Sequence, residues 1–535
     1  MKPFLNNVSG KTKSDIIYLN GGLNTCFDQT EIRDNQLAHC WNVCLMRSPT
    51  LATRSNRTSI AWLMEDTTIF AQERALAMFV SSSKTLYVVE YKDTNESYVY
   101  RYKVGVSSFI EKSYVGTIEY SDRYSICECK DSTYTYIYIS TPSKLYKYTE
   151  GNAMVEIQTY AGTIASHKNR LWIASNNIIR FSNLMQYDNF TIDPDDPINT
   201  AGEIQITNAR GRIVGLIPFD GKLVVLCDRS WHVIYGSSPN PEVDQFYLVD
   251  MDDGVGCCSP KGFAICDRSL YWMDSDVSVY KYNGSSLIKV SEPFGKKEGY
   301  AQYSGIKDYE IQKLRLQEVC MASFDSYLYI GVTSSFIHGA VNDTFFVYDT
   351  QSRVWWLEDG AFSDIVRWDT DVNTPFFNRT DLLVGAKYNG DLQILNCMQR
   401  IGYDLEFNKE TRGIDQVDIE YSFETKTWLL NSVKNKKTLT NVWWQADANA
   451  DVFAFDNWTF HTPGQEDITF LPIGKLVKAS SHNILTPTRY FHEGEERQRM
   501  IIPRMYLQRV NAFGLKVVGR GQGEFHLLEK EWRIK

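Results

Sequence analysis

Two clusters of aspartates come nearest, by residue type and spacing, to a chemical site. They are the acids of TIDPDDP and VDMDDG, namely Asp193, Asp195, Asp196, Asp250, Asp252 and Asp253. Carboxylates at such spacing could bind calcium or act as a general acid and base. However, no glutamate stands at the offset that an EF-hand loop requires, and both segments are typical of turns, where aspartate accepts hydrogen bonds from nearby backbone. We therefore expect these acids to cap turns.

The rest of the chain offers no anchor for catalysis, for a metal or for a cofactor. The eight histidines are dispersed without an HxH or HExxH pair, and the sequence contains no GxSxG, GxxxxGK or GxGxxG motif. Such motifs would supply metal ligands, a serine nucleophile or a phosphate-binding backbone. The aspartate box of sialidases is also absent. We expect no catalytic, cofactor-binding or metal-binding residues and no enzymatic activity.

The eleven cysteines are odd in number and form no CxxC pair, which disfavours both a disulfide framework and a structural zinc site. We interpret Cys26, Cys40 and Cys44 as buried thiols. The adjacent Cys257 and Cys258 suggest redox chemistry, but neighbours in a strand point to opposite faces. No signal peptide follows Lys2 and no run of eighteen apolar residues occurs, so we expect a soluble protein made in a reducing cytoplasm.

Composition favours an all-β fold with little affinity for nucleic acid. Hydrophobic residues make up 43% of the 535 residues, and 32 tyrosines stand against only 15 prolines. Aromatic and β-branched side chains fit the pleated surface of a sheet. The formal net charge of −9 falls entirely on residues 1–400, whereas residues 401–535 are neutral. A negative balance has the wrong sign for binding phosphates.

A pair of short strands recurs seven times before residue 400. We anchor the repeats on the first strand of each pair, at Leu86, Ile137, Leu171, Leu223, Leu270, Leu328 and Leu383. Their mean spacing of about 50 residues is typical of propeller blades. A blade has four antiparallel strands, so each period leaves room for two weaker ones. We predict a closed β-propeller of six or seven blades, with a large β-sandwich or several unrelated sheets as the alternative.

The chain changes character near residue 400, where longer alternating segments such as IEYSFETKTWLL and EFHLLEKEWRI replace the hairpins. Alternation over long runs is typical of strands with one inward and one outward face. We predict three parts: a lead-in over residues 1–50, the β-propeller over 51–400, and a C-terminal β-sandwich over 401–535. The segment EIQKLRLQEV, residues 310–319, is predicted to form a single surface helix.

The lead-in carries a pattern of its own, with Gly21, Gly22 and Asn24 followed by DNQLAHCWNVCL and then by Arg54. Together with GRIVGLIPFDGKLVVLCDRSWHVIYGSS and the closing LKVVGRGQGEFHLLEKEWRI, it resembles a family of bacteriophage tail and head-completion β-propeller proteins. The resemblance implies a homohexameric hub or nozzle in the virion tail, below the portal, through which the genome passes and which helps to retain packaged DNA. The cysteines of the lead-in depart from the family's pattern.

The same resemblance implies the partners: further copies of the chain, portal, adaptor and other tail proteins, and DNA that passes without specific binding. It also implies synthesis in the cytoplasm of a bacterial host and no insertion into a membrane. Gly21 and Gly22 would permit backbone angles that other residues avoid as the lead-in enters the first blade.

Three hypotheses follow from charge and aromatic content. The neutral residues 401–535 could form the ring contacts, because uncharged surfaces repel one another less. The six aspartates could line an acidic or neutral DNA channel in the ring, or could instead keep the outer surface soluble. The alternative function is a tail protein that binds or cleaves host glycans, with Trp355 and Trp356 stacking on sugars rather than packing in a core.

Overall fold

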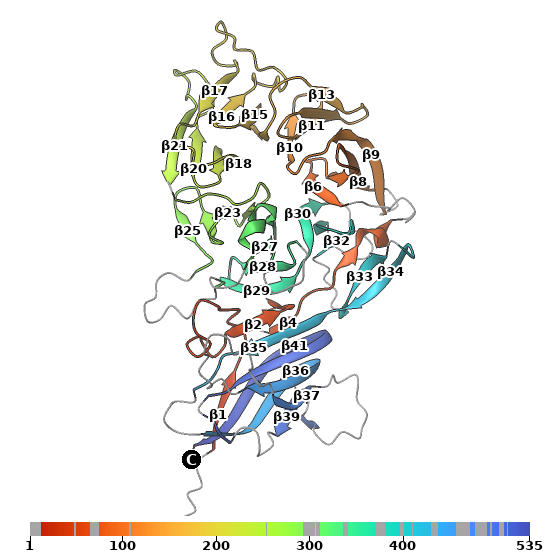
Figure 1. Cartoon of the computed structure of the whole chain (residues 1–535), viewed down its shortest axis with the longest axis vertical. Helices are drawn as coiled ribbons and strands as arrows, with labels where there is room; N and C mark the ends of the chain where they lie inside the picture. The colour runs from red at the N-terminus through yellow and green to blue at the C-terminus, as the bar shows by residue number, and fades with distance from the viewer. Residues whose placement is uncertain are drawn as a thin grey trace, which may run out of the picture.

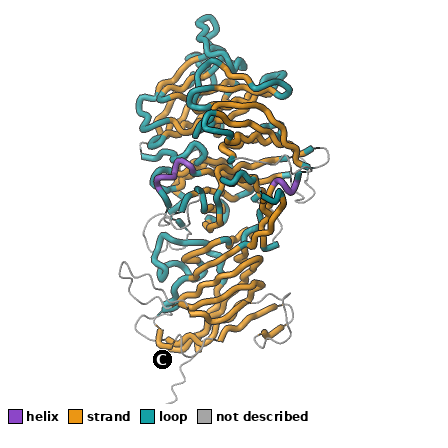
Figure 2. The backbone as a smooth tube through the Cα atoms, turned by 45° about the vertical axis from the view of Figure 1, so that its right-hand side comes forward, coloured by secondary structure: helices purple, strands orange, loops and turns teal. Residues whose placement is uncertain are grey.

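The chain folds almost entirely into β-strands. The structure, a computed structural model, describes residues 12–534 except 48–49, 65–73, 106–108, 253, 293–304, 307–310, 335–340, 371–379, 396–400, 409, 430–436, 456–470, 477–488, 493–494, 502–507 and 511. Within this part, strands and loops make up both bodies of the molecule, and helix is confined to two short segments (Figure 2). These are the 3₁₀ helices η1 (Ile60–Leu63) and η4 (Lys313–Glu318).

The helix predicted over residues 310–319 is therefore present in a shorter form. No side chain caps the N-terminus of η4 at Gln312, and the chain passes into the next strand at Cys320. Six residues between these limits form a 3₁₀ segment rather than a longer α-helix.

Seven sheets form the propeller, and Figure 1 shows them in order around a ring. The first three blades are β6 (Ala75–Val80), β7 (Leu86–Tyr91), β8 (Glu96–Val104) and β9 (Ile110–Glu119); β10 (Ser125–Lys130), β11 (Thr135–Ser140), β12 (Leu145–Thr149) and β13 (Val155–Ile157); and β14 (Thr163–His167), β15 (Arg170–Ser175), β16 (Ile178–Phe181) and β17 (Gly202–Gln205).

The next three blades have the same antiparallel order. They are β18 (Ile213–Phe219), β19 (Lys222–Cys227), β20 (Trp231–Tyr235) and β21 (Tyr247–Asp252); β22 (Phe263–Cys266), β23 (Ser269–Met273), β24 (Val279–Tyr282) and β25 (Leu287–Lys289); and β26 (Cys320–Phe324), β27 (Tyr327–Val332), β28 (Thr344–Asp349) and β29 (Val354–Asp359).

The seven anchor residues of the predicted repeat all lie in the second strand of their blades. Each is buried, with at most 2% of its surface exposed. Second strands are flanked by partners on both edges and covered on both faces by neighbouring blades, so they are continuously apolar. The prediction of a propeller is thus confirmed, with seven blades.

The seventh blade closes the ring with a strand from the beginning of the chain. Its order is β30 (Phe362–Asp369), β31 (Asp381–Lys387), β32 (Leu392–Ile394) and β5 (Thr58–Ser59), after which come β33 (Tyr403–Asn408) and β34 (Gly413–Asp418). The carboxylate of Asp391, beside β32, accepts a hydrogen bond of 2.6 Å from the Ser59 hydroxyl of β5. Strands from opposite parts of the chain therefore seal the ring, which removes its exposed sheet edges.

The C-terminal domain is one 11-stranded sheet, bent into a nearly closed, barrel-like form that is compatible with the predicted C-terminal β-sandwich. Its strands are β35 (Glu420–Thr425), β36 (Lys437–Phe455), β37 (Leu471–Leu476), β38 (Arg489–His492), β39 (Glu495–Ile501), β40 (Gln508–Val510) and β41 (Gly514–Ile534), together with β1 (Thr12–Ile17), β2 (Leu37–Trp41), β3 (Val43–Arg47) and β4 (Thr50–Thr53).

The lead-in thus belongs to the C-terminal sheet before it reaches the propeller. β1 pairs with the end of β41, where Thr12 lies opposite Arg533, and β2 pairs with β35. After the lead-in the chain supplies β5 to the last blade instead of passing directly into the first. Gly22 has a φ of +70°, so the backbone freedom predicted for this glycine is used.

Candidate functional site

The first predicted acid cluster caps a turn. Asp193, Asp195 and Asp196 lie in the loop between β16 and β17. The Asp193 carboxylate accepts the backbone N–H of Asp195 at 2.9 Å, and Asp196 accepts the backbone and side-chain amides of Asn199. These are the local hydrogen bonds of turn-forming aspartates. The prediction of turn capping is confirmed for this cluster.

The second cluster differs from the prediction, because Asp250 and the backbone of Asp252 lie in the outer strand β21 rather than in a turn; Asp253 lies outside the described residues. Asp250 stands opposite His232 of β20 and accepts its Nδ1–H at 2.6 Å. The Nε2 atom of His232 lies 3.2 Å from the hydroxyl of Ser230. Strand pairing decided this arrangement, since nothing in the local sequence links Asp250 to His232.

This Ser230–His232–Asp250 series has the connectivity of a catalytic triad, but its environment differs from that of one. Ser230 is 1% exposed, and its hydroxyl already accepts the backbone N–H of Arg210 at 3.0 Å. A serine nucleophile must reach its substrate. In the described fold the series links strands β20 and β21 to the loop that precedes β18.

The two tryptophans considered for sugar stacking are core residues. Trp355 and Trp356 of β29 are 0% and 2% exposed, and the indole of Trp356 donates to Glu358 at 3.1 Å. The packing interpretation of these residues is confirmed. Neither ring offers a face to a glycan in the described structure.

The ten described cysteines are free thiols, and eight of them are buried, Cys40, Cys44 and Cys257 among them. Burial raises the pKa of Cys40 and of Cys257 to about 12. Cys26 is half-buried, which differs from its interpretation as a buried thiol, because it lies in a surface bend of the lead-in. Among the described residues no three histidine, cysteine or acidic side chains come together as metal ligands, and no helix is long and apolar enough to cross a membrane.

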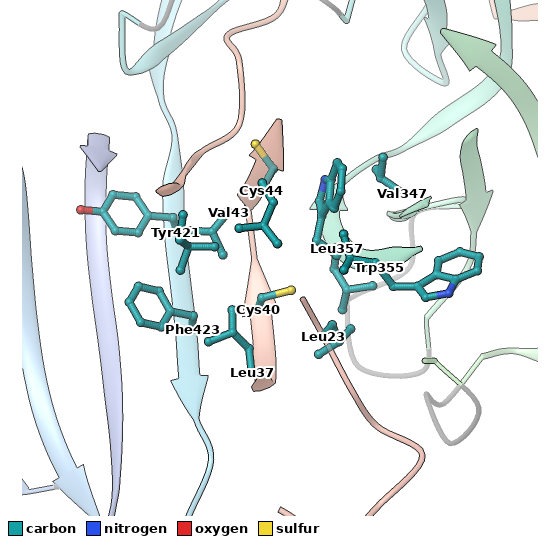
Figure 3. Close-up of a cluster of buried hydrophobic side chains, with 14 of the residues drawn as sticks. Leu23, Leu37, Cys40, Val43, Cys44, Val347, Trp355, Leu357, Tyr421 and Phe423 are labelled. Carbon is teal, nitrogen blue, oxygen red and sulfur yellow. The ribbon is translucent and has the colours of Figure 1, made fainter. Parts of the chain in front are cut away.

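The lead-in motif, whose sequence resembles the phage family, forms the junction between the propeller and the C-terminal domain. Figure 3 shows β2 between β35 of the C-terminal sheet and β29 of the sixth blade. Leu37 faces Phe423 on the side of β35, and Cys40 faces Leu357 on the side of β29. All four side chains are buried in one hydrophobic cluster that continues from the sixth blade into the C-terminal sheet. The domains therefore share a core.

Asn42 connects the three parts of this junction by hydrogen bonds. It has a φ of +56°, a conformation that asparagine tolerates better than most residues. Its side-chain amide donates to the carbonyl of Glu420 at 2.7 Å, while its side-chain oxygen accepts the N–H of Asp359 at 2.8 Å and Arg54 Nε at 3.1 Å. One lead-in residue thus holds the sixth blade and the start of β35.

Arg54 completes the junction as a buried ion pair with two carboxylates. Its guanidinium is 1% exposed and donates to both oxygens of Asp404, at 2.9 and 2.7 Å, and to both of Asp359, at 2.8 and 3.0 Å. Burial alone would lower the pKa of Arg54, but the two aspartates outweigh it and raise the pKa well above its ordinary value. Arginine suits this position because its planar fork matches two carboxylates.

The two aspartates differ in exposure. The Asp404 side chain is 8% exposed and also accepts the N–H of Arg57 at 2.7 Å, whereas the Asp359 side chain is 39% exposed. Burial opposes ionisation of Asp359, but Arg54 and Arg57 together lower its pKa below the usual range. We assign the larger share of the stabilisation to the Arg54–Asp404 pair, since exposed pairs are screened by solvent.

A central cavity of about 650 Å³ runs along the axis of the propeller and is lined by the innermost strands of all seven blades. On one side Lys261 donates to the carbonyls of Leu76 and Ser363, and its Nζ lies 3.8 Å from Asp364. On another side stand Arg123 and Arg212. The described acids of the two predicted clusters do not line this cavity. The acidic channel of an assembled ring stays a prediction.

Comparison with known proteins identifies no family for this chain. No protein-family model and no curated protein matches it. Among solved structures, the crystal structure of Chaetomium thermophilum Raptor is similar over 65% of this chain and 29% of that chain, with 10% sequence identity and a TM-score of 0.39. A similarity of this size carries no information about function.

Proposed function

We propose that this chain is a non-enzymatic structural protein of a bacteriophage tail, one subunit of a hexameric hub or nozzle below the portal. In this role the ring conducts the genome and helps to retain it after packaging. The proposal rests on the resemblance of the lead-in, the central blades and the closing strands to that family. It is supported by the position of the lead-in motif, whose Asn42 and Arg54 join the two domains.

The junction is the structural observation that supports the proposal. Domain interfaces within a chain are ordinarily modest and polar, so that relative motion is the default. Here β2 packs between the domains, and at the same place the buried Arg54 pairs with the buried Asp404 and with the partly exposed Asp359. A subunit that seals a pressurised channel needs such rigid coupling, because a hinge between its domains would open gaps in the ring.

Residues 401–535, which carry no net charge, remain our candidate for the contacts between subunits, because uncharged surfaces repel one another less. The portal and adaptor would lie at one face of the ring and other tail proteins at the other. The alternative, glycan binding or cleavage, loses the two tryptophans on which it was based, since both are buried.

The test is reconstitution with the neighbouring gene products. We expect portal and adaptor genes beside this gene, and we expect six chains of 61.6 kDa, about 370 kDa in total, to add to the purified portal–adaptor complex. Native mass spectrometry and electron microscopy measure the added mass and the symmetry. A chain that stays monomeric beside its own portal and adaptor, or a gene among unrelated functions, would overturn the proposal.

A further inference from the structure

Two arginines line the central cavity just before the inner strands of the second and fourth blades, and two more lie close to the second of them along the backbone. This arginine rim consists of Arg123, Arg210, Arg212 and Arg229, of which Arg123 and Arg212 line the cavity itself. The other two belong to the same backbone, because the N–H of Arg229 donates to the carbonyl of Arg210 at 2.9 Å. Arg123 is half-buried and the other three are exposed.

The loop that carries Arg210 and Arg212 is held at three points. Asn208 donates to Asp250 at 2.6 Å, the N–H of Arg210 donates to the Ser230 hydroxyl at 3.0 Å, and the N–H of Arg212 donates to Asp228 at 2.8 Å. The Ser230–His232–Asp250 series, in which Ser230 and His232 are buried and Asp250 is exposed, thus has a use in the fold, since two of its three members bind this loop. A loop ordered in advance loses little entropy when a ligand binds.

The third blade leaves the space between Arg123 and Arg212 open. Its inner strand begins directly after Gly162, as that of the fourth blade begins directly after Arg212, while Arg123 lies two residues before the inner strand of the second blade. Gly162 has a φ of +142°, and a Cβ there would lie 2.1 Å from the carbonyl oxygen of Ala174. No side chain can therefore fill this position of the rim.

The two cavity-lining arginines, Arg123 and Arg212, differ in their pairing with acidic side chains. Arg212 Nε lies 3.4 Å from Asp228, but the Arg123 guanidinium forms no hydrogen bond or ion pair with any residue that the structure describes. Burial lowers the pKa of Arg123 and the positive charge of Arg212 lowers it further, while the charges of Asp228 and Asp122 oppose this shift in part. Two guanidiniums that repel each other beside a cavity form a site that an anion would stabilise.

We propose that the arginine rim binds the phosphate group of a small phosphorylated molecule whose less polar part enters the central cavity. Arginine matches phosphate oxygens through paired N–H donors. The cavity, at about 650 Å³, has the size of small-molecule sites, and Phe79, Phe263 and Met321 supply apolar surface in it. This site belongs to a single chain, so the inference does not depend on the proposed ring.

Isothermal titration calorimetry with four probes tests the site: AMP, inorganic phosphate, adenosine and a 20-base-pair DNA duplex. We expect AMP to bind more tightly than phosphate or adenosine, and the duplex not to compete with it. Arg123→Ala and Arg212→Ala should each weaken AMP binding at least tenfold, because each removes one charged donor pair. The matched control is Arg268→Ala, an exposed arginine at the far end of the inner strand of the fifth blade.

The outcomes separate clearly. Equal affinity for AMP and adenosine, no AMP binding at millimolar concentration, or an equal loss in the Arg268→Ala control would overturn the proposal. Competition by the duplex would assign the rim to the genome backbone and overturn a small-molecule ligand. Circular dichroism and unfolding midpoints confirm that each variant is folded, so a loss of binding reports on the site.

Discussion

Replacing Arg54 by methionine should weaken the junction more than any substitution of a surface arginine. The change removes a guanidinium that is 1% exposed and leaves Asp404, whose side chain is 8% exposed, without its charged partner. Removing one partner of a buried ion pair costs about 3–5 kcal/mol. Asp404 keeps its bond from the N–H of Arg57, and Asp359 is partly solvated, so we expect the lower end, about 3 kcal/mol.

Urea unfolding followed by tryptophan fluorescence measures this loss, since Trp355 and Trp356 lie in the same hydrophobic cluster as the junction. The matched control is Arg520→Met, because Arg520 also pairs with an acid, Glu420, but the two side chains are 72% and 67% exposed. An exposed pair contributes about 0–1 kcal/mol. Arg54→Met combined with Asp404→Asn should recover part of the loss, because it removes the uncompensated charge.

The reasoning is refuted if Arg54→Met lowers the free energy of unfolding no more than Arg520→Met does. It is also refuted if the double variant is no more stable than the single one, since the cost would then come from lost packing rather than from a buried carboxylate without its partner.

Three further predictions concern pH, thiol reactivity and domain dependence. Burial raises the pKa of Asp391 to about 6, so the folded state holds this proton more tightly than the unfolded state. The free energy of unfolding should therefore fall by up to about 3 kcal/mol as the pH rises from 4 to 7. Urea titrations at several pH values measure this slope, which Asp391→Asn should flatten. At pH 8 iodoacetamide should not modify Cys40, Cys257 and Cys320 in the native protein, because burial raises the pKa of each thiol to about 12. Mass spectrometry should show that the same thiols are modified in urea, and rapid labelling of the native protein would contradict this prediction. Deleting residues 401–535 should give aggregates in size-exclusion chromatography, because it uncovers the apolar face of β2; a soluble propeller would show that the shared core is dispensable.

Local sequence pattern was sufficient to predict the propeller. The middle strands of a blade are buried on both faces, so residues such as Leu223 and Leu270 lie in short apolar runs that recur at the blade period. The turn at Asp193 was predictable for a similar reason, since an aspartate that caps a turn bonds to backbone only two residues away.

The sites depended on contacts between distant parts of the chain. Arg54 could be singled out as part of a motif, but its partners Asp359 and Asp404 lie 305 and 350 residues further on. Asp250 was expected in a turn because its neighbours are polar, whereas pairing with β20 makes it the partner of His232. No signal in the sequence pointed to the arginine rim, since Arg123 and Arg212 meet only when the blades close around one axis.

By itself the sequence determined what depends on short-range periodicity: an all-β chain and a blade of about 50 residues. Tertiary structure alone decided where the lead-in goes. β1 pairs with the last strand of the chain and β5 closes the seventh blade, and both pairings join residues separated by more than 300 positions. Backbone hydrogen bonding between strands is nearly independent of side-chain identity, so the residues of a strand do not determine which strand it pairs with. The pairing is decided by the burial of the strand's apolar face in the assembled core.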